Sequence, residues 1–236
     1  MPDDDATMTL LEHLEELRSR LIVSVVAVVL GAVVGLFLSE PVLELLRRPL
    51  PDEGAELIVT RVTDAFAVRL KLAGFVGIVL AMPVILFQVW RFVTPGLTRH
   101  ERRVVWPLLI VALLLFAAGV GIGYAIIPYA VEFLLSFRIE GVPALLELPE
   151  YVGFVTTMMI VFGIVFEFPI LLIGLARVGI LDRRRLARGR RWAILAIVLF
   201  AIVATPGGDP ISPIILSSVM YLLYEAALLV VRLTGR

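Results

Sequence analysis

The strongest candidate for chemistry in this sequence is a glutamate inside an apolar run. Glu167 stands in the stretch Val165–Pro169, about 13 Å from the nearer end of that run by helical rise. An ionisable group at that depth in a bilayer is costly unless it is protonated, paired or in contact with water, so a functional role is the default hypothesis. Pro169 lacks a backbone N–H and is expected to bend the helix. The alternative is a protonated glutamate that only packs. Glu225, in the last apolar run with two tyrosines nearby, is a weaker case of the same kind.

The amino-terminal stretch Thr9–Arg20 carries the second candidate, Glu16. The stretch is typical of an amphipathic helix, because leucines recur at helical spacing on one face and charged residues occupy the rest. Thr9 and Glu12 have the spacing of a capping box. Such a helix is expected to lie at the membrane surface and to lead into the first apolar run. The alternative for Glu16 is a solvated position supported by Arg20, one turn later.

The third candidate is Glu101, the only acid in the loop between the second and third apolar runs. Arginines surround it in the stretch Thr98–Arg103. A plain ion pair with Arg99 or Arg102 is one interpretation, and such a pair contributes little at a wet surface. A binding role requires that these neighbours leave Glu101 available.

Catalysis and resident metal ions find no support in the sequence. It has no cysteine, and its only histidines, His13 and His100, lie far apart, so no cluster of metal ligands is visible. Lys71 follows Leu70, which excludes the Gly-Lys-Ser/Thr phosphate loop. We therefore expect a protein that binds and moves something rather than an enzyme.

The composition places these residues in a membrane. Of the 236 residues, 60% are hydrophobic, and the mean hydropathy of +1.01 is far above that of a soluble domain. We expect one membrane domain over residues 1–236, all-α, with six transmembrane helices. The predicted spans are 21–38, 66–90, 104–127, 151–176, 192–204 and 211–231. The fifth gives only about 20 Å of helix, and it is expected to pair with the sixth through the turn Thr205–Pro210.

Arginine counts in alternate connections predict the orientation of these spans. Basic residues near span ends remain in the cytoplasm. One set of connections and termini carries 15 arginines, and the opposite set carries four. Both termini are therefore expected in the cytoplasm.

Five motifs, in order along the chain, give this sequence its resemblance to a known family. They are His13–Arg18, Pro83–Pro95, His100–Arg103, Phe166–Pro169, and Thr205-Pro206 with Asp209. Together they are similar to the TatC family, the signal-peptide receptors of the twin-arginine protein translocase, along essentially the whole chain. The resemblance implies a concave, glove-like bundle of six helices with an amphipathic amino-terminal helix. It also implies a receptor for the twin-arginine signal peptides of folded, exported proteins.

The resemblance assigns roles to individual residues. It implies that Glu16 and Glu101 bind the paired arginines at the cytoplasmic face, because two planar guanidinium groups match two carboxylates. The family positions that support or border this site are Arg18, Pro49, Phe66, Phe92 and Pro95. Glu167 corresponds to a buried glutamate that meets the partner subunits. Asp209 corresponds to an acid on the far, periplasmic side, but the family's common Thr-Pro-Pro-Asp turn is one residue longer here, so its role stays open.

The resemblance also implies partners and a location. The partners are TatA-type and TatB-type single-span subunits in a multi-copy complex, together with membrane lipid, and export draws on the proton-motive force. The location is a bacterial or archaeal cytoplasmic membrane, with no cofactor, metal or nucleic acid involved. Two rivals stay open. A secondary transporter of a small solute would also place Glu167 in a membrane cavity, whereas an intramembrane enzyme would need a nucleophile pair or metal ligands that the spans lack.

Overall fold

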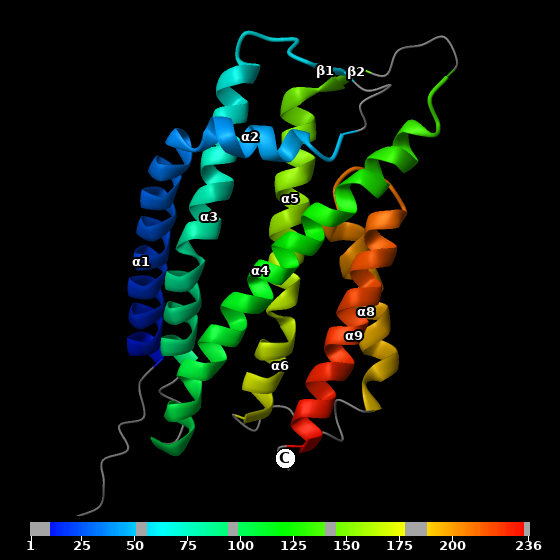
Figure 1. Ribbon diagram of the computed structural model, residues 1–236. Coiled ribbons are helices and arrows are strands. Elements are labelled where there is room, and N and C mark those ends of the chain that lie inside the picture. The colour runs from blue at the N-terminus through cyan, green and yellow to red at the C-terminus, as the bar shows by residue number, and fades with distance from the viewer. Residues whose placement is uncertain (1–9, 51–55, 94–98, 140–144, 178–187, 234–236) are drawn as a thin grey trace, which may run out of the picture.

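The chain folds almost entirely into long helices that run side by side (Figure 1). The computed structural model describes residues 10–50, 56–93, 99–139, 145–177 and 188–233. Its elements, in chain order, are α1 (Leu10–Phe37), α2 (Ser39–Arg47), β1 (Glu56–Ile58), α3 (Asp64–Val93), α4 (Arg99–Leu135), β2 (Leu145–Glu147), α5 (Leu148–Phe166), α6 (Phe168–Arg177), α8 (Arg190–Ala204) and α9 (Ile211–Leu233). The all-α membrane fold predicted from the sequence is confirmed.

Five helical segments are long and apolar enough to cross a membrane. They are Leu11–Phe37, Asp64–Phe92, Pro107–Leu135, Leu148–Ala176 and Ile211–Leu233. These match five of the six predicted spans, and the fourth of them consists of α5 and α6 in succession. The remaining predicted span, 192–204, is α8, whose 15 residues rise only about 22 Å. A typical hydrocarbon core is about 30 Å thick, so α8 is shorter than a full span.

The amphipathic stretch predicted near the amino terminus is the first part of α1. This helix continues without a break from Leu10 to Phe37. The leucines of the predicted apolar face, among them Leu14, Leu17 and Leu21, are exposed on the protein surface. The stretch is therefore continuous with the first span, because α1 passes through Arg20 and Leu21 without a break, and it does not form a separate surface helix.

Glycines allow α1 and α3 to approach each other closely. Gly31 lies against the backbone of Gly77, and Gly35 lies against the backbone of Ala73. A Cβ atom added at Gly77 would lie 2.7 Å from the carbonyl oxygen of Val28. These small residues bring the two helix backbones together, which is the usual way that helices pack in a membrane.

A second set of glycines joins α4 to α5 in the same way. Gly119 and Gly123 of α4 face the backbone of α5 near Phe162 and Met159. The α5 side of this contact is the centre of the core, where Met158 and Phe162 are fully buried. Helices α1 and α4 thus each have a pair of glycines four residues apart, Gly31 and Gly35 on α1 and Gly119 and Gly123 on α4, that contacts a neighbouring helix.

The short helix α2 crosses the ends of α3 and α5 at the face opposite the start of α1 (Figure 1). Its carboxyl end is held by two tyrosines from other helices. The hydroxyl of Tyr124 donates to the carbonyl of Leu45 at 2.8 Å, and that of Tyr151 donates to the carbonyl of Leu46 at 2.7 Å. The last carbonyls of a helix lack partners within it. These two bonds therefore complete the end of α2 and fix it on α4 and α5.

Two short strands join connections that are distant in the sequence. β1 pairs with β2 in parallel, with Glu56, Leu57 and Ile58 opposite Leu145, Leu146 and Glu147. Parallel strands need a long crossover connection. Here that connection consists of α3 and α4, so the pair links the start of α3 to the start of α5.

Candidate functional site

Glu16 lies near the start of α1 in a largely buried ion pair. Arg20, one turn later, donates from Nη2 to Oε1 of Glu16, and the two side chains are only 14% and 17% exposed, respectively. The second oxygen, Oε2, is buried without a hydrogen-bond partner in the described part of the chain. It lies 3.8 Å from Nδ1 of His13. The ion pair between Glu16 and Arg20, which the helical spacing offered as an alternative, is thus present in the structure. Arg20 bonds only one of the two carboxylate oxygens of Glu16.

An aromatic contact brings the end of α3 to Glu16. The rings of His13 and Phe92 stack with their centroids 4.3 Å apart and their planes inclined by 20°. His13 is one turn before Glu16 on α1, and Phe92 is in the last turn of α3. Glu16 and Phe92 therefore lie at the same end of the molecule, as the sequence-based site requires.

Two residues expected at this site lie at the other end of the molecule. Phe66 is in the first turn of α3 and Phe92 in its last, so about 39 Å of helix separates them. Pro49 is two residues after the last residue of α2, a helix that lies at the end of the molecule where α3 begins (Figure 1). Phe66 therefore does not contact Glu16 directly, because α3 crosses the whole molecule between them, and the expectation that Pro49 and Phe66 support or border the site stays a prediction.

The remaining residues of the expected site are only partly described. Arg18 is exposed and, two positions after Glu16, points to nearly the opposite side of α1. Glu101 is in the first turn of α4, but its side chain lies outside what the structure describes, and Pro95 lies outside the described residues altogether.

A groove between α1 and α3 begins beside Glu16. It has a volume of about 410 Å³, and its lining is mostly apolar. The lining residues are Leu17, Arg20, Leu21, Ser24, Val25, Val28, Val29, Ile85, Gln88, Val89 and Phe92. No local sequence pattern predicts this groove, because its two walls are more than fifty residues apart in the chain.

Glu167 marks the break between α5 and α6. Its backbone N–H donates to the carbonyl of Ile164 at 3.0 Å, and its own carbonyl accepts from Leu171 at 3.1 Å. Oε1 of Glu167 is buried and has no hydrogen-bond partner among the residues that the structure describes. The predicted interruption near Pro169 is confirmed, since α5 ends at Phe166 and α6 begins at Phe168.

Glu225 has partners from two helices. Arg190, at the start of α8, donates to its Oε2 at 2.9 Å, and Tyr221 donates to its Oε1 at 3.1 Å. The tyrosine was visible as a neighbour in the sequence. Arg190 was not, because it is distant in the chain and only the packing of α8 on α9 brings it close.

Asp209 closes the turn between α8 and α9 and caps α9. Its Oδ1 accepts from the backbone N–H of Ser212 at 2.7 Å, and the side chain is buried. Gly207 and Gly208 have φ values of 103° and 70°, which is the left-handed region that favours glycine. The longer Thr-Pro-Gly-Gly-Asp turn thus still places an acid on the first free N–H groups of the next helix.

Substitution of Asp209 tests this capping role. Asp209→Ala should lower the free energy of unfolding by about 1 kcal/mol, the usual cost of losing a helix cap. Asp209→Asn should keep most of the stability, because the amide oxygen can accept the same bond. Thermal unfolding of the purified protein in detergent measures both. Equal stability of Asp209→Ala and the unsubstituted chain would show that the bond to Ser212 does not hold the turn.

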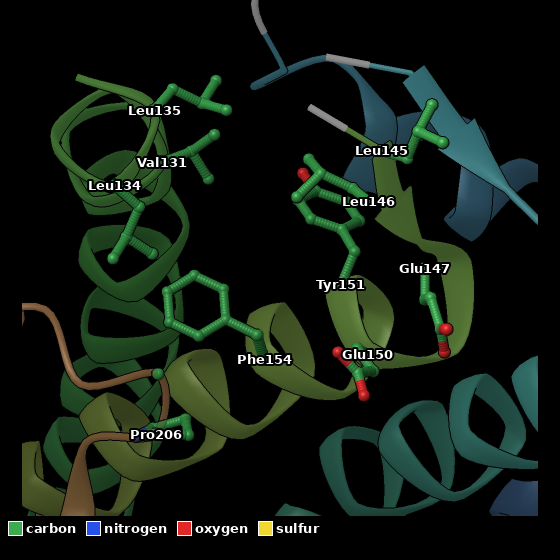
Figure 2. Close-up of a pocket in the computed structure, with 11 residues that line it drawn as sticks. Val131, Leu134, Leu135, Leu145, Leu146, Glu147, Glu150, Tyr151, Phe154 and Pro206 are labelled. Carbon is green, nitrogen blue, oxygen red and sulfur yellow. The ribbon is translucent and has the colours of Figure 1, made fainter. Parts of the chain in front are cut away.

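A second hollow lies at the end of the molecule opposite Glu16 (Figure 2). It has a volume of about 570 Å³ and lies between the end of α4, strand β2, the start of α5 and the turn after α8. Figure 2 shows Leu134 and Phe154 on its walls, with Pro206 near the bottom of the view and Glu147 and Glu150 near the start of α5. Within the described residues, no group of three or more histidine, cysteine or acidic side chains is placed to hold a metal ion.

Comparison with known proteins shows which family the chain resembles. The family model for TatC, the Sec-independent protein translocase protein, matches residues 12–218. The TatC protein of Deinococcus radiodurans is 37% identical over 98% of this chain and 88% of its own length. The chloroplastic TATC protein of Arabidopsis thaliana is 34% identical over 99% of this chain and 69% of its own length.

A solved structure agrees as well. The crystal structure of a twin-arginine translocase receptor, TatC, superposes with a TM-score of 0.83 at 33% identity, and the match covers 95% of this chain and all of that one. Sequence and fold therefore agree over nearly the whole length. The chain belongs to the TatC family of Sec-independent protein translocase proteins, and it is a multi-pass membrane component of a translocase rather than an enzyme.

Proposed function

We propose that this chain is the receptor that binds twin-arginine signal peptides, and that Glu16 and Glu101 hold the two arginines. The observation that carries the proposal is that only one of the two carboxylate oxygens of Glu16 has a hydrogen-bond partner in the described chain. One oxygen is paired with Arg20, and the other has no hydrogen-bond partner in the described chain although it is buried. A buried carboxylate oxygen without a donor is costly. An incoming guanidinium would satisfy it with a charge-assisted hydrogen bond.

The surroundings of Glu16 fit a cationic peptide. Phe92 stacks on His13, one turn before Glu16, so aromatic rings lie near the carboxylate, and guanidinium groups stack well on aromatic faces. We place Arg18 and Pro95 at the border of this site on the family pattern, with Glu101 as the second carboxylate. Pro49 and Phe66 are proposed to support it without direct contact, since they lie at the opposite end of the molecule.

The positions of the arginines support an orientation of the chain in the membrane. The start of α1 and the end of α9 lie at one end of the molecule (Figure 1), and the end of α3 with Arg91 and the start of α8 with Arg190 lie at that end too. We place this end, with both termini, in the cytoplasm of a bacterial or archaeal cell. TatA-type and TatB-type single-span subunits are the proposed partners, and Glu167 is the proposed contact for them.

Peptide binding tests the receptor role. The purified chain, reconstituted in lipid nanodiscs, is titrated with a labelled twin-arginine signal peptide and with its twin-lysine form. The arginine peptide should bind roughly ten- to a hundredfold more tightly, the range expected for hydrogen bonds between charged groups. Glu16→Gln and Glu101→Gln should each abolish this preference.

Glu15→Gln is the matched control, because Glu15 adjoins Glu16 on α1 but is exposed to solvent. It should keep the preference for arginine. A preference that is absent from the unsubstituted chain, or that survives in both Glu16→Gln and Glu101→Gln, would contradict the proposal. Thermal unfolding of each variant separates loss of binding from loss of fold.

A further inference from the structure

The start of α8 presents a basic and aromatic surface to its surroundings. Arg190, Arg191 and Trp192 are the first three residues of this helix. All three are exposed, and the exposed fraction of Trp192 is 75%. We infer that Arg191, with Trp192 beside it, binds the phosphate of an anionic phospholipid headgroup. This inference does not depend on the proposed receptor function.

Arg191 differs from Arg190 in having no acidic partner. Arg190 donates to Oε2 of Glu225 at 2.9 Å, and Tyr221 donates to Oε1 of the same carboxylate at 3.1 Å. Both oxygens of Glu225 are therefore engaged. In the part of the chain that the structure describes, no acid lies within ion-pair distance of Arg191. Its guanidinium group is available to an anion from outside the chain.

The ion pair between Arg190 and Glu225 fixes the depth of the start of α8. Glu225 is eight residues before Leu233, the last residue of α9, which corresponds to about 12 Å of helix. The 23 residues of α9 are long and apolar enough to cross a membrane. Since Arg190 lies beside Glu225, α8 begins about 12 Å inside the level at which α9 ends. Arg191 therefore enters the bilayer region rather than standing clear of it.

An arginine at this depth requires an anion or water. A charged side chain inside a bilayer is costly, and the cost falls when the side chain extends toward the interface or when the bilayer thins locally around it. The anion present at the interface is the lipid phosphate, and a planar guanidinium can bind phosphate oxygens through two parallel hydrogen bonds. Tryptophan rings favour the same headgroup level, which explains why Trp192 is exposed beside Arg191.

The charge around Arg191 favours an anionic lipid over a zwitterionic one. The described residues here carry three arginines, Arg188, Arg190 and Arg191, against the single acid Glu225. The ammonium group of phosphatidylcholine would meet this positive surface, whereas the glycerol of phosphatidylglycerol carries no positive charge. A basic residue near a membrane surface favours anionic lipid by about fivefold. Phosphatidylglycerol is therefore the lipid that we expect at Arg191.

The fluorescence of Trp192 reports which lipid lies beside Arg191. The chain has three tryptophans, so Trp90→Phe with Trp106→Phe leaves Trp192 alone as the reporter. This starting variant is reconstituted in vesicles of phosphatidylcholine and phosphatidylglycerol, with bromine on the acyl chains of one lipid or the other. Bromine quenches a tryptophan that it contacts. Quenching at equal mole fractions should show that phosphatidylglycerol binds about fivefold more tightly than phosphatidylcholine.

Substitutions of Arg191 test its role in this selectivity. Arg191→Gln should reduce the preference to less than about twofold, because the charge is lost. Arg191→Lys should keep part of it, since an ammonium attracts phosphate without the two parallel bonds. Arg138→Gln is the matched control: it removes the same charge from an exposed arginine beyond the end of α4, at the opposite end of the molecule. It should keep the full preference, and thermal unfolding checks that each variant is folded.

Three results would overturn the inference. The first is equal quenching by the two brominated lipids in the starting variant, and the second is a preference that survives in Arg191→Gln. The third concerns the source of the phosphate. Inorganic phosphate, added in place of chloride at constant ionic strength, should leave the preference unchanged. If it abolished the preference, Arg191 would be a site for soluble phosphate and not for a lipid headgroup.

Discussion

Gly119→Ala should destabilise the protein strongly, whereas Gly121→Ala should not. A Cβ atom at Gly119 would lie 2.5 Å from the carbonyl oxygen of Phe162 and 2.9 Å from the Cα of Gly163. Both atoms belong to the backbone of α5, so neither can move without shifting the helix. Overpacking of this kind costs about 1–3 kcal/mol or more.

The control lies on the same helix, two positions away. At Gly121 an added Cβ would find nothing within 4 Å. Alanine there should be neutral or slightly stabilising, because alanine favours a helix more than glycine does. Thermal unfolding in detergent compares the two variants, and each kcal/mol should lower the midpoint by roughly 2–4 °C in a protein of this size. Equal midpoints would show that α4 and α5 are not held at the distance described.

Glu167→Leu should raise the thermal stability of the isolated chain and abolish export. The buried Oε1 of Glu167 has no hydrogen-bond partner in the described chain, and such a group costs about 1–3 kcal/mol. Leucine removes that cost. If Glu167 is kept for contact with partner subunits, as we propose, the same change removes the contact. Greater stability combined with lost function is typical of residues retained for a role.

Glu167→Gln separates charge from shape in the same experiment. Export of a twin-arginine reporter into membrane vesicles, with partner subunits present, measures function, and thermal unfolding measures stability. The amide retains hydrogen bonding, so we expect Glu167→Gln to export more than Glu167→Leu. Normal export by Glu167→Leu would favour the alternative of a glutamate that only packs.

Local sequence patterns predicted the parts of the structure that depend on neighbours along one helix. Length and apolar composition located the spans, and Pro169 located the break beside Glu167. The pairing of Glu16 with Arg20 depends on helical spacing alone, so it was a stated alternative before the structure was known. The turn residues after Thr205 likewise predicted the pairing of α8 with α9.

Features that depend on tertiary contact were not accessible in this way. The bond from Arg190 to Glu225 and the bonds from Tyr124 and Tyr151 to α2 each join distant parts of the chain. The helix α2 was missed because it is short and its apolar face is covered only by other helices. No single-helix pattern signals such contacts.

The placement of Phe66 shows a limit of reasoning from family positions. Residues that share a role in a family need not touch one ligand, and α3 holds Phe66 and Phe92 at opposite ends. The arginine counts already placed the connection before Phe66 on the side away from Glu16. Topology was therefore the better guide to which residues form one site.

The parallel pair of β1 and β2 constrains the order of events during synthesis. Because β1 leaves the ribosome before α3 and α4, it has no partner strand until both helices have been made. The pair can close only after these two helices have inserted as a complete hairpin that returns the chain to its starting side. The pairing of β1 with β2 therefore indicates that α3 and α4 of the nascent chain have inserted correctly. If the hairpin of α3 and α4 failed to insert, both strands would stay unpaired and exposed to proteases.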